Sequence, residues 1–282
     1  MRLSFNSWLY CAFPVWLPLR SLDDVIDLLG EIGYDGIEIG AAAPHGFPAY
    51  LDAERRRAIL KRLHARGLEV SALCPALGGA PGYNPVSPDA AERDAGQRYV
   101  VDCIDLAHDL GCATVIWLGG YRRYDQSVEA AWRLAVEGLR QSAEHAQKRG
   151  VRLVVEPTAA DSNVLEQAGD CLRLIEEADV DCGVMVDTFH VLHRDDDMRD
   201  ALRSAGDRLE YVHIADLDRD PPGTHHDFRS VVEELATSGF EGWLSMEIGF
   251  NRREADPDAL VRRASESMRG LLEGTSSRLR PG

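Results

Sequence analysis

Four apolar segments in the second half of the chain each end in a side chain that can bind a metal ion. The segment VRLVV is followed by Glu156, GVMV by Asp187, LEYV by His213 and WLSM by Glu247. Apolar runs of this length are typical of buried parallel strands, whose carboxyl ends meet at the same edge of a sheet. Three carboxylates buried together carry a large charge penalty without a cation. The pattern therefore predicts that these four side chains share one divalent ion.

Each of the four residues has a plainer explanation when it is taken alone. A single acid at a strand end is more often a helix N-cap or a solvated loop residue, and His213 alone could be a hydrogen-bonded core histidine. Four such coincidences on consecutive strands favour the metal site. The donor set is rich in oxygen, so we expect Mn²⁺, with Mg²⁺ or Co²⁺ as alternatives, rather than a thiolate-bound zinc.

A repeating pattern along the chain predicts the elements that must position these residues. An amphipathic helical stretch ends at a glycine or short turn, and an apolar segment follows; with residues 2–8 as an opening strand, eight strands result. The clearest helix-ending glycines, expected in the left-handed conformation, are Gly33, Gly67, Gly111, Gly150 and Gly239.

Eight βα units in about 250 residues are typical of a (β/α)₈ TIM barrel. A doubly wound open sheet fits less well because the first βα turn lacks a glycine-rich phosphate motif. We therefore expect residues 1–273 to form a single (β/α)₈ barrel and residues 274–282 to form a frayed, disordered tail. In such barrels the residues that carry the chemistry lie at the carboxyl ends of the strands.

The composition excludes several functional classes. The 282 residues include 47 acidic and 31 basic side chains, which gives a net charge of −16. This charge repels phosphate backbones and anionic lipid, so we expect neither nucleic acid nor membrane as a partner. No apolar run approaches the roughly 20 residues that span a bilayer, and the opening segment lacks a signal-peptide cleavage site. The six cysteines form no CxxC pair. We expect a cytoplasmic protein with reduced cysteines.

The motifs between Val154 and Gly249 resemble those of a known superfamily of enzymes. The segments VVEP, MVDTFH, VHIADLDR and SMEIG look like those of the xylose isomerase-like sugar isomerases and epimerases, in particular the D-tagatose and D-psicose 3-epimerase type. The resemblance extends over essentially the whole predicted barrel. It implies a metal-dependent isomerase or epimerase that acts on a keto sugar, with Glu156 and Glu247 as the catalytic acid and base. It also implies a homo-oligomer.

The same resemblance implies three substrate contacts. His190, three residues after the aspartate ligand, and Arg219, six residues after the histidine ligand, match residues that hold the sugar in that family. Trp117, near the end of the fourth predicted strand, matches an aromatic residue that lies against the sugar. His190 could instead cap the next helix, and Trp117 could be barrel core.

Two features depart from this template. The family carries a further substrate-binding glutamate where this chain has Ser162, so ketohexose specificity does not carry over. The segment 41–51, which places His45 near the barrel mouth, and the segment EPTAADSN resemble the catalytic subunit of bacterial C-glycoside deglycosidases. That resemblance implies an alternative: a lyase that eliminates the aglycone from a 3-keto glycoside with the same metal site and a separate small subunit.

One chemical step unites the epimerase and the lyase. A divalent ion that bridges a ketone oxygen and its neighbouring hydroxyl stabilises the enediolate formed when the adjacent C–H proton is lost. For epimerisation, two glutamates on opposite sides of the substrate remove a proton from one face and return it to the other. For elimination, the enolate expels a group one carbon further on. The pattern indicates proton removal more firmly than it indicates the fate of the enolate.

Two other classes share the predicted fold. Abasic-site endonucleases need further metal ligands and a basic face for DNA, which the charge of −16 opposes. A non-catalytic sugar-binding barrel would be expected to have lost one of the paired glutamates, and both are present. Among sugar substrates we expect a neutral polyol ketone rather than a sugar phosphate. Arg122 and Arg123, after the fourth strand, are the main argument against that expectation.

Overall fold

Eight parallel strands close into a barrel in which each strand pairs with its neighbours in the chain and the last pairs with the first. The computed structural model describes residues 1–11, 17–77 and 82–279. The strands are β1 (Arg2–Asn6), β2 (Gly36–Gly40), β3 (Glu69–Cys74), β4 (Thr114–Leu118), β5 (Arg152–Glu156), β6 (Gly183–Asp187), β7 (Leu209–Ile214) and β8 (Trp243–Met246). This architecture confirms the predicted (β/α)₈ barrel.

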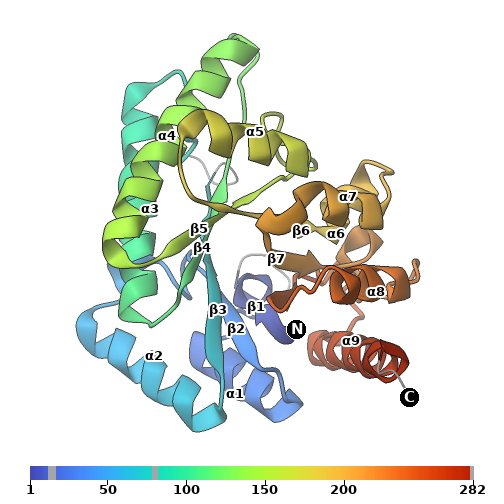
Figure 1. Cartoon of the computed structure of the whole chain (residues 1–282). Helices are drawn as coiled ribbons and strands as arrows, with labels where there is room; N and C mark the ends of the chain where they lie inside the picture. Colours follow the sequence, from blue (N-terminus) through green and yellow to red (C-terminus); the bar gives the residue numbers. More distant parts are fainter. Residues whose placement is uncertain (12–16, 78–81, 280–282) are drawn as a thin grey trace.

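Helices surround the strands and connect them (Figure 1). They are α1 (Leu22–Ile32), α2 (Ala53–Arg66), α3 (Ala90–Asp109), α4 (Val128–Arg149), α5 (Ala168–Ala178), α6 (Thr188–His193), α7 (Met198–Ala205), α8 (Arg229–Thr237) and α9 (Pro257–Leu279). Short 3₁₀ turns are η1 (Ser7–Tyr10), η2 (Pro48–Tyr50), η3 (Gly206–Arg208) and η4 (Leu217–Arg219). Because η1 directly follows β1 and η4 lies shortly after β7, both stand at the carboxyl end of the barrel.

Capping residues set the helix boundaries that the sequence pattern indicates. The Ser21 side chain accepts a hydrogen bond from the backbone N–H of Asp24 and so satisfies one of the free donors at the start of α1. The same helix ends at Gly33, whose φ of 91° is in the left-handed region that favours glycine. The other four predicted helix-ending glycines also have positive φ.

The last helix extends further than the sequence pattern predicts. We expected a frayed tail from Gly274 onward, whereas α9 continues to Leu279. Val261 and Met268 are fully buried and anchor the first turns of this helix against the barrel. An anchored helix extends through polar residues at low cost, because propagation adds one hydrogen bond for each residue fixed. Residues 280–282 lie outside the described part of the chain.

Alternation along each strand divides the buried side chains into two sets. One set fills the barrel and includes Cys74, Ile116, Met185 and Tyr211. The other lies between the barrel and the helices and includes Val115 and Trp117 of β4 together with many helix residues, among them Ala135 and Leu139 of α4. Successive strand residues point to opposite faces. Only the inward-facing set can therefore reach a site at the barrel mouth.

Trp117 belongs to the outward-facing set, which corrects the expectation that it contacts a sugar. Its indole is 1% exposed and approaches Gly138 of α4, where an added Cβ would lie 3.8 Å from the ring. The neighbours Ile116 and Leu118 pack inside the barrel. Trp117 lies near the carboxyl end of β4, as expected, but successive strand residues point to opposite faces, and this side chain points to the helices rather than into the barrel.

Two further expectations concern the chain as a whole. All six cysteines are buried and unpaired, as their apolar surroundings suggest. Across the described ranges, no helix combines the length and apolar character needed to span a membrane.

Trp117→Ala should lower the free energy of unfolding by about 3–5 kcal/mol, the usual loss on truncating a large core aromatic side chain. Urea unfolding followed by circular dichroism measures this change. Trp132→Ala in α4 is the matched control. Its indole is only partly buried and donates a hydrogen bond to Glu177, so a smaller loss is expected. Equal losses in the two variants would contradict the placement of Trp117 in the core.

Candidate active site

The structure brings the four predicted ligand residues together at the carboxyl end of the barrel. Glu156 ends β5, Asp187 ends β6, His213 lies one residue before the end of β7 and Glu247 directly follows β8. Strand register aligns them: Asp187 pairs with His213, and the backbone N–H of Glu247 donates to the carbonyl of Ile214 at 3.1 Å. One potential ligand atom from each of the four side chains lies within 4.8 Å of the others.

The two ring nitrogens of His213 have different environments. Nδ1 lies 3.2 Å from Glu247 Oε2, 3.3 Å from Glu156 Oε1 and 3.9 Å from Asp187 Oδ2, yet it has no hydrogen-bond partner. Nε2 lies 2.8 and 3.0 Å from the two carboxylate oxygens of Glu38. Both His213 and Glu38 are fully buried. The imidazole is therefore fixed from one side and presents Nδ1 to the three carboxylates on the other.

Glu38 and Asn6 are site residues that our sequence reasoning missed. The Asn6 amide donates to Glu38 Oε1 at 2.7 Å and to Glu247 Oε1 at 3.0 Å, and so links β1, β2 and β8. The Tyr211 hydroxyl donates to Glu38 Oε2 at 2.8 Å. A usable sign was present in the segment GIEIG, where an ionisable residue stands between two isoleucines of a buried strand. That pattern indicates an inward-facing carboxylate.

Burial and charge act differently on the two predicted catalytic glutamates. Burial disfavours the charged form of Glu156 and raises its pKa to about 7, although His213 partly offsets this. Burial also opposes ionisation of Glu247, but the charges of Arg219 and His213 outweigh it and hold the pKa of Glu247 below its usual range. For His213, burial is outweighed by the nearby carboxylates, led by Glu247, and its pKa is raised. The cluster thus favours positive charge at its centre.

The donors fit a divalent ion. A buried, unpartnered imidazole nitrogen surrounded by three carboxylates is a polar group that lacks its complement, and such groups are rare without a functional reason. One imidazole and three carboxylates match ions such as Mn²⁺ and Mg²⁺ in ligand preference. Glu156, Asp187, His213 and Glu247 could therefore hold such an ion. Glu38, Cys74 and Glu247 form a second close group of potential ligands, but the Glu38 oxygens already accept hydrogen bonds.

Arg219 lies beside the ligand cluster. Its Nη1 is 2.7 Å from both Asp187 Oδ2 and Glu247 Oε2, and the guanidinium lies over the Phe189 ring at 4.1 Å. The backbone at Arg219 has a φ of 58°, an uncommon conformation for a residue with a side chain. The backbone N–H of Gly249 donates to the Arg219 carbonyl at 2.6 Å and helps to hold this turn. Strain of this kind is frequent where a side chain must be aimed at a site.

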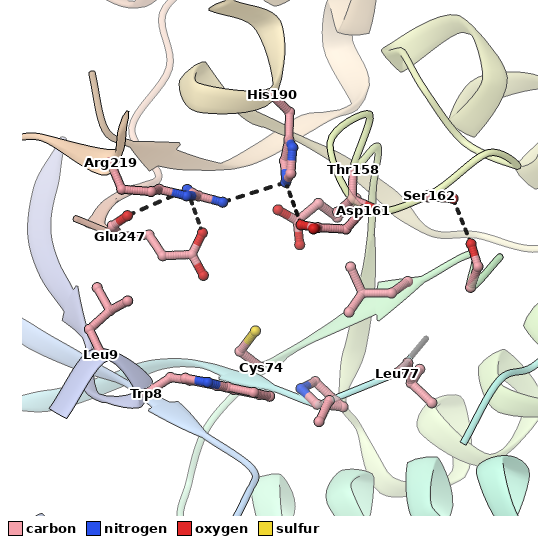
Figure 2. A pocket seen from close by; sticks show the side chains of 15 residues that line it. Trp8, Leu9, Cys74, Leu77, Thr158, Asp161, Ser162, His190, Arg219 and Glu247 are labelled. Carbon is pink, nitrogen blue, oxygen red and sulfur yellow. Dashed lines mark hydrogen bonds and ion pairs between the residues drawn. The ribbon is translucent and has the colours of Figure 1, made fainter. Parts of the chain in front are cut away.

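His190 also faces the cluster, from α6. Its Nδ1 accepts a hydrogen bond from the backbone N–H of Ala160 at 3.2 Å, and its Nε2 lies 3.6 Å from Asp187 Oδ2. Burial lowers the pKa of this imidazole. Nε2 also lies 3.5 Å from Arg219 Nη2, so the His190 and Arg219 side chains meet at the same part of the cavity (Figure 2).

A cavity of about 240 Å³ opens beside these side chains and has two unlike walls. Figure 2 shows Arg219, Glu247, His190 and Asp161 along one side, with Trp8, Leu9 and Leu77 along the other. The cavity is lined by Trp8, Leu9, Cys74, Pro75, Ala76, Leu77, Leu118, Gly120, Glu156, Thr158, Asp161, Ser162, His190, Arg219 and Glu247. Such a cavity can hold a molecule that is polar on one face and has C–H groups on the other.

Ser162, the departure from the family pattern, lines this cavity. Its hydroxyl donates to the Gly120 carbonyl at 2.6 Å and accepts from the backbone N–H of Val164 at 3.1 Å. The side chain thus ties the loop after β5 to the loop after β4. Its single donor is already used within the protein.

The structure does not bring His45 to the cavity, contrary to the expected substrate contact. Its ring is 1% exposed, and Nε2 donates to the carbonyl of Arg20 at 2.8 Å. The loop after β2 folds this side chain inward, where it supports the neighbouring backbone. His225 and His226 also serve local structure, because they pair with Asp220 and Asp216 of their own loop at 2.9 and 2.7 Å.

Comparisons with known proteins agree with this geometry. A family model described as a xylose isomerase-like TIM barrel matches residues 26–271. Fructoselysine 3-epimerase of Shigella flexneri is 27% identical over 259 residues, which cover 86% of this chain and 90% of that protein. D-psicose 3-epimerase of Agrobacterium fabrum is 29% identical over 208 residues, 70% of this chain and 68% of that protein. The structure of an L-ribulose 3-epimerase aligns with a TM-score of 0.82 at 25% identity, over 98% of this chain and 96% of that one. With fold, motif positions and family model in agreement over most of its length, this chain belongs to the xylose isomerase-like TIM-barrel family.

Proposed function

We propose that this chain is a divalent-metal-dependent sugar epimerase that acts on a keto sugar through an enediolate. Relatives named as ketose 3-epimerases support the sugar epimerase activity. The observation that carries the proposal is the unpartnered Nδ1 of His213, which lies beside Glu156 and Glu247 at the edge of the cavity. A divalent ion held by these three residues and Asp187 would supply Lewis-acid stabilisation of charge that develops on the oxygens of the substrate.

Glu156 and Glu247 perform the proton transfers. Both line the cavity and come from different strands, β5 and the end of β8. One carboxylate takes the proton from the carbon next to the ketone, and the other carboxyl group returns a proton to the opposite face of the same carbon. The configuration at that carbon is thereby inverted.

Arg219 and His190 orient the substrate. The guanidinium of Arg219 and the imidazole of His190 lie side by side on the polar wall of the cavity, where hydroxyl and carbonyl oxygens of a sugar would bind. The opposite wall, with Trp8 and Leu77, suits the C–H face of a sugar and limits access of water to the reacting carbon.

The charges that line the cavity favour a neutral substrate. The lining includes the acids Glu156, Asp161 and Glu247, and Arg219 already contacts Glu247. The two arginines that could have favoured a sugar phosphate are engaged elsewhere: Arg122 donates to the carbonyl of Gln126, and Arg123 pairs with Asp125. A phosphate dianion would need a donor nest or paired cations.

The lyase alternative is not favoured, because the relatives reported above are epimerases. In addition, His45, which belongs to one of the two segments that suggested the lyase, lies away from the cavity. The homo-oligomer implied by the family stays a prediction.

Metal-free protein should bind one Mn²⁺ per chain, and saturation to 100 times Kd should raise the free energy of unfolding by about 2.7 kcal/mol. Electron paramagnetic resonance counts the bound ion, and thermal unfolding measures the stabilisation. Asp187→Asn should weaken binding strongly. Cys74→Ser is the control and should bind as wild type does; loss of binding in that variant would point instead to the group that contains Cys74 and Glu38.

Glu156→Gln and Glu247→Gln should each lower kcat by about 10²-fold or more, because glutamine retains an oxygen donor but cannot act as a base. His190→Ala and Arg219→Ala should mainly weaken substrate handling and so raise KM. Glu177→Gln, which changes an exposed carboxylate of α5 outside the cavity, is the control and should retain most activity. Turnover like that of wild type in either glutamine variant with metal bound would refute the acid/base assignment.

The enzyme should prefer a free ketose over its phosphate ester. Values of kcat/KM for the two compounds, measured with the same Mn²⁺ concentration, test this directly. A tenfold or greater preference for the phosphorylated sugar, about 1.4 kcal/mol of transition-state binding, would overturn the proposal of a neutral substrate.

A further inference from the structure

We propose that Glu38 of β2 is a positioning residue that makes Nδ1 of His213 a metal ligand. The inference rests on the metal site of the proposed function. In this proposal the first half of the barrel contributes to metal binding, although the four candidate ligand residues all come from the second half. It also explains why an ionisable side chain stands in the middle of a fully buried strand.

Hydrogen bonding at Glu38 determines which nitrogen of His213 carries the proton. Glu38 accepts from the Asn6 amide at 2.7 Å and from the Tyr211 hydroxyl at 2.8 Å. His213 Nε2 lies within 3.0 Å of both of its oxygens. Both Glu38 oxygens act as acceptors in these contacts, so Nε2 is the donor toward them. In the neutral ring Nδ1 then keeps its lone pair, and this lone pair faces Glu156, Asp187 and Glu247.

The opposite arrangement would disable the site. If Nε2 lost its acceptor, the proton could move to Nδ1, which would then donate to Glu156 or Glu247 at 3.3 or 3.2 Å. His213 would become a hydrogen-bond donor to the carboxylates rather than a fellow ligand. A carboxylate on the far nitrogen of a ligand histidine prevents this change and makes the ligand more basic.

The same carboxylate also acts on Glu247 through Asn6. Asn6 Oδ1 accepts the backbone N–H of Trp8 at 2.9 Å, which orients the amide so that Nδ2 faces the two glutamates. Nδ2 then donates to Glu38 at 2.7 Å and to Glu247 at 3.0 Å. Glu38 thus holds one ligand directly and helps to fix a second.

Glu38→Gln tests the inference. Glutamine keeps the size of the side chain but replaces one acceptor oxygen with an NH₂ donor, although His213, Tyr211 and Asn6 all need acceptors there. Mn²⁺ titration of the full chain, followed by electron paramagnetic resonance, should show a 10–100-fold weaker affinity. Glu210→Gln is the matched control. It neutralises a carboxylate near the start of β7 that pairs with Arg152 and does not contact His213, so its affinity should stay within about threefold of wild type, in line with an independent distant site.

The outcomes separate this inference from the proposed function. If wild type binds Mn²⁺ and Glu38→Gln binds it equally well, the role of Glu38 is wrong while the metal site stands. If wild type binds no Mn²⁺, both are wrong. Circular dichroism on metal-free protein checks that both variants are folded.

A measurement on wild type decides the matter if Glu38→Gln does not fold. Nitrogen-15 NMR of histidine-labelled protein, with the His213 signals assigned by their loss in His213→Asn, reports the protonation of each ring nitrogen. We expect Nε2 to carry a proton in the Mg²⁺-loaded protein and Nδ1 to shift when Mg²⁺ is added. A proton on Nδ1 in the Mg²⁺-loaded protein, or a shift of Nε2 rather than Nδ1 when Mg²⁺ is added, would overturn the inference.

Discussion

The carboxyl end of the barrel concentrates buried negative charge around a single imidazole. Glu38, Glu156, Asp187 and Glu247 surround His213 within a few ångströms, and Arg219 is the basic side chain that contacts two of them. Buried carboxylates are stable only when they are paired, hydrogen-bonded or bound to metal. The need for a cation at this point explains the raised pKa of His213 and the chemistry of the cavity beside it.

Several parts of the fold position the groups around His213. Strand register places the four candidate ligand residues at one height. Glu38 and Asn6, from the first two strands, fix the far side of the imidazole and one oxygen of Glu247. The turn at Arg219 adds a guanidinium through an uncommon backbone conformation. The helices and the outward-facing core, to which Trp117 belongs, keep these strands in register. Fold and site therefore depend on the same strand pairing.

The sequence predicted that Glu156, Asp187, His213 and Glu247 lie close together, because each stands at or next to the carboxyl end of an apolar strand. The sequence was less informative about side chains whose role depends on whether they point into the barrel or toward the helices. Trp117 stands at the right height but faces the helices, and one residue of strand register decides between those outcomes. Glu38 went unnoticed because it lies within a strand rather than after one. His45 lies on a loop whose path depends on tertiary contacts with Arg20 that no periodic pattern reveals.

Solvent exchange at the reacting carbon tests the central claim most directly. A ketose substrate incubated in D₂O with Mn²⁺-loaded protein should gain one deuterium at the epimerised carbon next to the ketone, both in the epimer and, more slowly, in recovered substrate. That result follows from proton removal and return by the two glutamates. Epimer formed with no deuterium at that carbon would show that the C–H hydrogen does not exchange with solvent during the reaction and would contradict the account.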